Sequence, residues 1–293
     1  MRCLLLAIAA LVLAALPVFA AEILILQGNS SRNMNQVTRL VQNDCGASSS
    51  TLVLSDYTEL DLARLVREER PAVVVAIGDH AVTSAKKIRT VPTVYSMALN
   101  TDEDTLARNV SGVSMIVSPK SYLQLFASLK LRKVGVIHDR NHTGAYMRRA
   151  MATATGMGIE LVPLQIRNSR EVQQRLFEMQ KRKVDALWIL PDSTAVTPET
   201  VDSYFTFAQR YNLPIIAYSA AYLAKGALAA VELTPQEIGK QLCGKIRLSK
   251  TGSSSGTTDS TAGKLFFNNA VAEKLGMRIP QVSLLPPSLS TDS

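Results

Sequence analysis

Short apolar runs recur along the chain, and each of them ends in small polar residues. Runs of this kind between turn residues are typical of β-strands. Several runs are apolar throughout, which is typical of strands covered on both faces. We therefore predict strands at residues 23–26, 52–54, 72–77, 93–96, 134–138, 159–164, 186–190, 215–218, 227–231 and 264–267.

Apolar residues recur at helical spacing between these strands, as at Val37 and Val41. Three helices have clear starts, because Ser118, Thr197 and Thr234 each precede a proline. A hydroxyl at the N-cap followed by proline at the first helical position is a strong start signal. Thr234 and Glu237 also have the spacing of a capping box.

The alternation of strands and helices predicts an α/β fold of two doubly wound parallel-sheet lobes joined by a hinge. We assign residues 22–112 and 234–258 to lobe 1, and residues 113–232 and 264–282 to lobe 2. Between the lobes there is no linker rich in proline and glycine. The stretch from 249 to 263, rich in Ser, Thr and Gly, is predicted to be a mobile loop, and residues 283–293 a flexible tail.

The first twenty residues have the pattern of a cleavable secretory signal. Arg2 provides the positive start, residues 4–16 the apolar stretch, and Ala20 the small residue before the cleavage point. Cys3 lies too early to be the lipid-modified residue that follows a lipoprotein cleavage site. No later stretch has 18 or more apolar residues. We therefore expect a soluble periplasmic protein without a lipid anchor.

The formal net charge of +8 falls to +7 once Arg2 leaves with the signal, which removes no acidic residue. The basic residues are scattered, so we expect no nucleic-acid partner. Cys45 and Cys243 remain in the mature chain. An oxidising compartment would let them pair, but each also fits a small buried residue, since Cys243 lies on an apolar stripe.

Four segments in order resemble one family. They are 109–114 (NVSGVS), 133–137 (KVGVI), 187–192 (LWILPD) and 268–280 (NNAVAEKLGMRIP). Together they resemble the ABC transporter substrate-binding proteins of the type I periplasmic fold, the group that includes tryptophan and tyrosine binders. The resemblance implies a two-lobed receptor that closes on a small ligand and delivers it to a membrane permease. The chain departs from that family at Gly78, Asp79 and His80, where relatives carry a Thr-rich turn, and this leaves the ligand open.

The strand ends supply the candidate site, because parallel sheets collect ligand contacts at the carboxyl ends of their strands. Residues 29–31 open a helix whose free N–H groups suit a carboxylate, and Thr143 offers a similar start in the second lobe. Each of these residues also fits a plain helix cap. The candidate ligand-binding residues are Asn29, Ser30, Ser31, Asp79, His80, Tyr95, Ser96, His138, Asp139, Thr143, Asp192, Thr194, Tyr218 and Ser219.

An amino-acid ligand would need an acceptor for its ammonium group. Asp192 is the first choice because it ends a strongly apolar strand, with Asp79 and Asp139 as competitors. Tyr95 and Tyr218 end predicted strands and are candidates to stack on an apolar or aromatic ligand.

The three histidines allow a different ligand. His80, His138 and His142 all fall at strand ends or the loops after them, beside Asp79 and Asp139. Imidazoles with carboxylates bind transition metals, so a metal binder is an alternative. The sequence lacks dense Cys/His spacing, and hydrogen bonding is the simpler role for these histidines.

Catalysis is not indicated. The chain has neither a Gly-x-Ser-x-Gly nucleophile elbow nor a phosphate-binding Gly-x-x-x-x-Gly-Lys loop. Gly156 and Gly158 fit a helix end instead. We therefore expect a monomeric periplasmic receptor without a cofactor, which delivers an amino acid, an aromatic one among the candidates, to an ABC importer. The alternative output is a ligand-sensing subunit for a membrane sensor kinase or cyclase.

Overall fold

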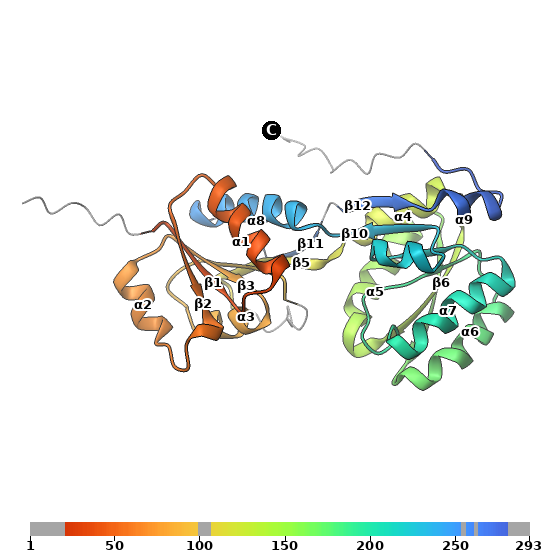
Figure 1. Cartoon of the computed structure of the whole chain (residues 1–293), viewed down its shortest axis with the longest axis horizontal. Helices are drawn as coiled ribbons and strands as arrows, with labels where there is room; N and C mark the ends of the chain where they lie inside the picture. Colours follow the sequence, from red (N-terminus) through yellow and green to blue (C-terminus); the bar gives the residue numbers. More distant parts are fainter. Residues whose placement is uncertain (1–20, 99–106, 253–255, 261–262, 281–293) are drawn as a thin grey trace, which may run out of the picture.

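Two six-stranded sheets, each covered by helices, form the two lobes of the molecule (Figure 1). The computed structural model describes residues 21–98, 107–252, 256–260 and 263–280. The predicted signal (1–20) and tail (283–293) lie outside these residues. Within the described ranges, no helix has the length and apolar character needed to cross a membrane.

The first sheet is parallel throughout, in the order β11-β5-β4-β3-β1-β2. Its strands are β1 (Ile23–Gln27), β2 (Ser49–Val53), β3 (Val73–Ile77), β4 (Thr93–Ser96), β5 (Val110–Val117) and β11 (Thr257–Ser260). Buried side chains of α1 and α8 pack on one face, and those of α2 and α3 on the other. The helices are α1 (Arg32–Asp44), α2 (Leu62–Glu69), α3 (Asp79–Ala85) and α8 (Pro235–Lys250), with a 3₁₀ turn at Leu54–Asp56.

The second sheet has the order β12-β10-β9-β8-β6-β7, and only its edge strand β12 is antiparallel to its neighbour. Its strands are β6 (Lys133–Asp139), β7 (Glu160–Ile166), β8 (Ala186–Trp188), β9 (Ile215–Ala217), β10 (Ala229–Glu232) and β12 (Lys264–Phe267). The helices are α4 (Pro119–Ser128), α5 (Arg140–Thr155), α6 (Val172–Lys181), α7 (Pro198–Tyr211) and α9 (Asn269–Lys274), with 3₁₀ turns at Ser169–Glu171 and Ala220–Lys225. The predicted fold class is confirmed.

All ten predicted strands are present, with boundaries shifted by up to three residues. Two strands were missed. Residues 109–114, the first of the four family segments, overlap the start of β5, so the predicted lobe boundary after Gly112 lies inside that strand. The segment predicted to be a mobile loop, 249–263, contains the end of α8 and the whole of β11.

The helix starts are placed correctly, but their caps differ in detail. Thr234 accepts a hydrogen bond from the backbone N–H of Glu237, which is only the first half of the predicted capping box. The reciprocal box forms at Thr197 and Thr200 instead. Ser118 makes no side-chain cap. Its backbone N–H donates to the carbonyl of Ser260 over 2.7 Å, which continues the parallel pairing of β5 with β11.

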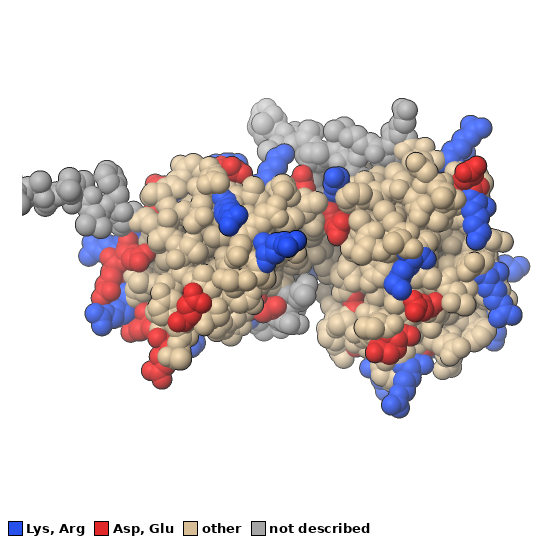
Figure 2. Space-filling view, viewed as in Figure 1, with Lys and Arg blue, Asp and Glu red and all other residues tan. Residues whose placement is uncertain are grey.

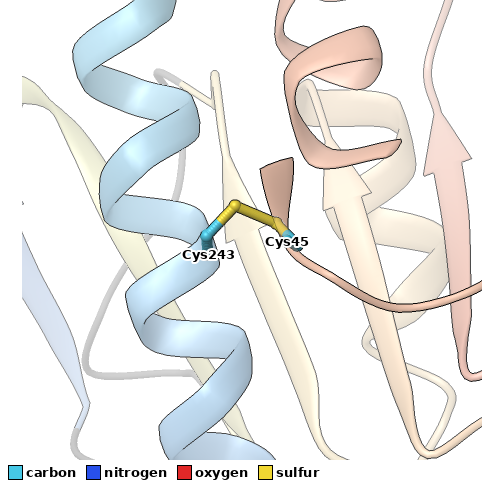
Figure 3. Close-up of a disulfide and its surroundings, with 2 residues drawn as sticks. All are labelled: Cys45 and Cys243. Atoms are coloured by element: carbon cyan, nitrogen blue, oxygen red, sulfur yellow. A yellow bond between two sulfur atoms is a disulfide. The ribbon is translucent and has the colours of Figure 1, made fainter. Parts of the chain in front are cut away.

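A disulfide closes the first lobe. Cys45 at the end of α1 is bonded to Cys243 in α8, and the two lie 198 residues apart in sequence (Figure 3). Both cysteines are also buried in the core between α1, α8 and the sheet. The two possibilities that the sequence left open, a disulfide and small buried residues, are therefore both true. The bond therefore joins α8, which comes late in the sequence, to α1, which comes early in the same lobe.

The chain passes between the sheets three times, after β5, after β10 and after β11 (Figure 1). Two tyrosines of the second lobe hold the first two crossings. The hydroxyl of Tyr146 donates to the carbonyl of Val117 over 2.8 Å, and that of Tyr122 donates to the carbonyl of Val231 over 3.1 Å. Gly263, just before β12, lies so close to the Val117 and Val231 side chains that a Cβ there would be 3.0 and 2.8 Å from them. The three crossings therefore converge into one hinge.

Candidate ligand-binding site

The surface is notched between the two lobes on the side where α3 and α5 face each other (Figures 1 and 2). Both helices follow directly after strands, α3 after β3 and α5 after β6. In each sheet the strand order reverses at this place, beside β1 in the first lobe and beside β6 in the second. Such switch points are where open α/β sheets bind ligands.

A cavity of about 430 Å³ opens at the hinge end of this notch. That volume lies within the range of small-molecule sites. Its walls come from the end of β5, from α4, from the segments after β8 and β9, and from the end of β10. The lining residues are Met115, Ile116, Val117, Tyr122, Pro191, Asp192, Ser193, Val196, Tyr218, Ser219, Val231, Glu232 and Leu233.

Asp192 lies at the inner wall, 1% exposed, and its carboxylate is fully occupied by its own chain. Oδ1 accepts the backbone N–H groups of Thr194 and Ala195, each over 3.0 Å. Oδ2 accepts the backbone N–H of Asp139 over 2.8 Å and the hydroxyl of Thr143 over 2.7 Å. A carboxylate has about four acceptor positions, and here all four are used.

In this structure Asp192, the predicted ammonium acceptor, has no acceptor position left over for a ligand. It joins the segment after β8 to the start of α5 after β6, across the switch point of the second lobe. Asp139 strengthens the same junction, because it caps α5 by accepting the N–H of Asn141 and also accepts the hydroxyl of Thr194 over 2.9 Å. The predicted group Asp139, Thr143, Asp192 and Thr194 is one network, and its role is to fix the cavity wall.

Glu232 is the other carboxylate of the lining, and it was not among the candidates predicted from the sequence. It is half-buried at the last position of β10. Its Oε1 accepts the hydroxyl of Ser219 over 2.9 Å. Ser219 follows β9, so this contact joins two neighbouring strand ends beneath the cavity. The only available signal was the position, a carboxylate ending an apolar strand, as for Asp192.

Tyrosines supply the aromatic part of the wall. The hydroxyls of Tyr218 and Tyr222 are hydrogen-bonded over 3.0 Å, and their rings meet edge to face at 5.4 Å. Burial raises the pKa of Tyr218 and of Tyr122 well above the usual range, so both phenols stay neutral. Tyr122 packs against the buried Trp188 at 4.8 Å between ring centroids. Tyr218 therefore lines the cavity, and its predicted stacking on a ligand stays a prediction.

The candidates of the first lobe lie on its own rim and do not line the cavity. Asn29 and Ser30 are exposed, and Ser31 caps α1 by accepting the N–H of Met34 over 3.4 Å. Asp79 begins α3 and is half-buried, whereas His80 beside it is exposed. These residues can meet a ligand only across the notch.

Two other candidates of the first lobe belong to its interior. Tyr95 is 2% exposed, its hydroxyl is hydrogen-bonded to that of Thr257 over 2.8 Å, and its ring covers Gly112. Ser96 is fully buried and donates to the carbonyl of Val113 over 3.0 Å. Tyr95 and Ser96 are thus held inside the sheet and its core, and neither lines the cavity.

The histidines are not gathered around a shared site. His138 is 2% exposed at the end of β6, and burial lowers the pKa of its imidazole against the opposing effect of Asp192 and Asp139. The Nε2 atom of the exposed His142 lies 3.9 Å from Oδ2 of Asp139. Among the residues that the structure describes, no three His, Cys, Asp or Glu side chains are placed to hold a metal ion. The metal-binding alternative thus gains no support.

The sequence from 53 to 288 matches the family model described as ABC transporter substrate binding protein. The chain belongs to this family. No curated protein matches this substrate-binding protein in sequence. The predicted resemblance is confirmed, and with it a solute-binding role.

Solved structures share the fold of this substrate-binding protein at low sequence identity. A substrate-binding protein with adhesive properties from Clostridium difficile, in its ligand-free, open structure, is 18% identical with a TM-score of 0.64. An ABC domain in complex with L-Trp from Streptococcus pneumonia is 18% identical with a TM-score of 0.55. A conserved domain protein from Vibrio cholerae is 19% identical with a TM-score of 0.54. Each alignment covers 89% of this chain and 96% of the other.

The family motifs have structural roles in this substrate-binding protein. The amide of Asn109 donates to the carbonyls of Ile88 and Val91, which fixes the turn before β4. Asn268 caps α9, and its amide donates to the carbonyl of Leu223. Asn109 and Asn268 therefore hold turns next to the strands, and neither residue lines the cavity.

Proposed function

We propose that the protein is a periplasmic receptor that captures a small solute in the hinge cavity and delivers it to the permease of an ABC importer. In this proposal the mature protein begins after Ala20 and acts as a monomer. The ligand has an apolar or aromatic body that packs on Tyr218, Tyr122 and the aliphatic side chains of the wall. No covalent chemistry is required.

The observation that carries this proposal is the place of the cavity. Its walls combine the strand ends of the second lobe with the last residues of β5 and β10, which are two of the three hinge segments. A ligand held there contacts the hinge directly. Its differential affinity for the closed state would then draw the first-lobe rim, with Asn29, Ser30 and Asp79, over the notch.

The disulfide supports the proposed location. Cys45 and Cys243 are bonded in the described structure. Such bonds form and persist in oxidising compartments such as the periplasm. The amino-terminal segment with Arg2, an apolar stretch and Ala20 supplies the route of export.

Thermal unfolding of the mature protein in the presence of candidate solutes tests the proposal. The panel is L-tryptophan, L-tyrosine, L-leucine, tryptamine, indole-3-acetate and short peptides. A solute at a hundredfold excess over its dissociation constant adds about 2.7 kcal/mol to the free energy of unfolding. We expect at least one aromatic member to raise the melting temperature.

The variant Ser193→Trp is the control for the place of binding, because Ser193 lines the cavity while exposed at its rim. We expect this variant to lose the ligand-induced shift. Thr206→Trp, on the exposed side of α7, should keep it. A panel without any shift, or a shift that Ser193→Trp leaves unchanged, would refute the proposed site.

A further inference from the structure

The charges of the cavity lining are all of one sign. Asp192 and Glu232 are its carboxylates, and no lysine, arginine or histidine lines it among the described residues. The remaining lining residues are neutral. An anionic solute entering this cavity would lose water without gaining a counter-ion, which is costly.

The two carboxylates differ in the number of hydrogen-bond acceptor positions that are left for a ligand. Asp192 spends all four acceptor positions on its own chain. Glu232 accepts one hydrogen bond, from Ser219, on Oε1. Its Oε2 is thus the carboxylate oxygen of the lining with acceptor capacity for a ligand.

The basic residue opposite Glu232 on the neighbouring strand is Lys264, and its ammonium group lies over an aromatic ring. Lys264 is the register partner of Glu232 across the β10–β12 pair. Its ammonium group lies 5.0 Å from the centroid of the Phe266 ring, and Lys264 does not line the cavity. The charge of Glu232 is therefore directed to the cavity without a paired cation beside it in the lining.

We infer that the cavity selects solutes that combine a cationic amine with an apolar or aromatic body, and that Glu232 is the counter-ion of that amine. This inference rests on the proposed function and names the ligand class for the same cavity. Ser219 holds the carboxylate in place through Oε1, which leaves Oε2 to accept from the ammonium. Hydrogen bonds between charged partners at a half-buried site are shorter and stronger than neutral ones.

The position of Glu232 gives the amine a second effect. Glu232 is the last residue of β10, and the chain crosses to the first lobe immediately after it. An ammonium group bound to Glu232 therefore contacts a hinge segment directly. A neutral ligand with the same body would fill the cavity without this contact.

Calorimetry with three indole probes separates the amine from the rest of the ligand. Tryptamine carries the amine alone, indole-3-acetate the carboxylate alone, and L-tryptophan both. We expect tryptamine to bind at least tenfold more tightly than indole-3-acetate, with an affinity that falls as salt is added.

Glu232→Gln is the decisive variant, since it keeps the size and the acceptor for Ser219 but removes the charge. We expect tryptamine to lose tenfold or more in affinity, and indole-3-acetate to lose none. Glu160→Gln makes the same charge change on the edge strand β7, where Glu160 pairs with Lys133, and it should leave both affinities unchanged. Far-ultraviolet circular dichroism confirms that each variant is folded.

The outcomes distinguish this inference from the proposed function. Equal binding of tryptamine and indole-3-acetate, both lost in Ser193→Trp, would overturn the inference while the cavity remains the binding site. Tryptamine binding that Glu232→Gln leaves intact would also overturn it. No binding of any probe, together with no shift across the wider solute panel, would overturn both.

Discussion

At the scale of single residues, the carboxylate of Asp192 shows how a buried charge is made stable. It accepts two backbone N–H groups of its own turn, one N–H from the start of α5, and one hydroxyl. A buried charge is tolerated only when its acceptor positions are filled in this way. The same bonds hold two strand ends of the second lobe at a fixed distance, which is what a preformed binding wall needs.

We expect Asp192→Ala to lower the free energy of unfolding by about 3 kcal/mol or more, because it leaves three N–H donors and a hydroxyl without a partner. Guanidinium denaturation of the mature protein measures this. Asp202→Ala, which removes an exposed partner of Lys225, should cost less than about 1 kcal/mol. A small effect of Asp192→Ala on stability with a large loss of ligand binding would return Asp192 to the role of ligand acceptor.

Sequence patterns identified the strand ends but not the direction in which their side chains face. Tyr218, Ser219 and Asp192 do line the cavity, because they follow β9 and β8 at the carboxyl ends of these strands. Tyr95 ends a strand just as clearly, yet its ring is covered in the core. The difference depends on which face each neighbouring helix covers, and that is set by contacts between segments far apart in the chain.

At the scale of elements, the missed strands show what a strand pattern leaves out. In β5 the residues from Ser114 to Ile116 are only half-buried, and the segment 109–114 overlaps the start of this strand. The strand β11 reads Thr-Thr-Asp-Ser and has no apolar run at all. It pairs in parallel with β5 at the sheet edge through its backbone, so its existence depends on the neighbour it finds.

The pairing of β4 with β5 depends on a glycine. Tyr95 lies directly beside Gly112, and a Cβ at Gly112 would enter the space of the Tyr95 ring. We expect Gly112→Ala to lower the free energy of unfolding by about 1–3 kcal/mol through overpacking. Gly244→Ala in α8 has open space around it and should be neutral or stabilising. Comparable stability of the two variants, measured by chemical denaturation, would show that the Tyr95 ring moves aside without cost.

At the scale of the whole molecule, three crossings join the lobes, and one disulfide closes the first lobe. The segment from Thr234 to Ser260 returns from the second lobe to complete the first sheet and its helical cover. The core between α1, α8 and the sheet includes residues of β1 and α1 as well as residues of the late helix α8. The first lobe is therefore assembled from two distant stretches of chain.

We expect loss of the disulfide in Cys45→Ser/Cys243→Ser to lower the free energy of unfolding by roughly 2–5 kcal/mol, because the bond closes a loop of 198 residues in the unfolded chain. Denaturation with and without a reducing agent measures the effect, and the reducing agent should shift only the wild type. The double variant should still bind a solute that the wild type binds, since neither cysteine lines the cavity. Equal stability of the two proteins would contradict this expectation.

The separation of Cys45 from Cys243 also sets an order of events during biosynthesis. Cys45 emerges from the ribosome 198 residues before its partner, so the amino-terminal lobe waits with an unpaired thiol while the whole middle of the polypeptide is made. The bond can therefore form only after α8 has been made, late in the synthesis of the chain.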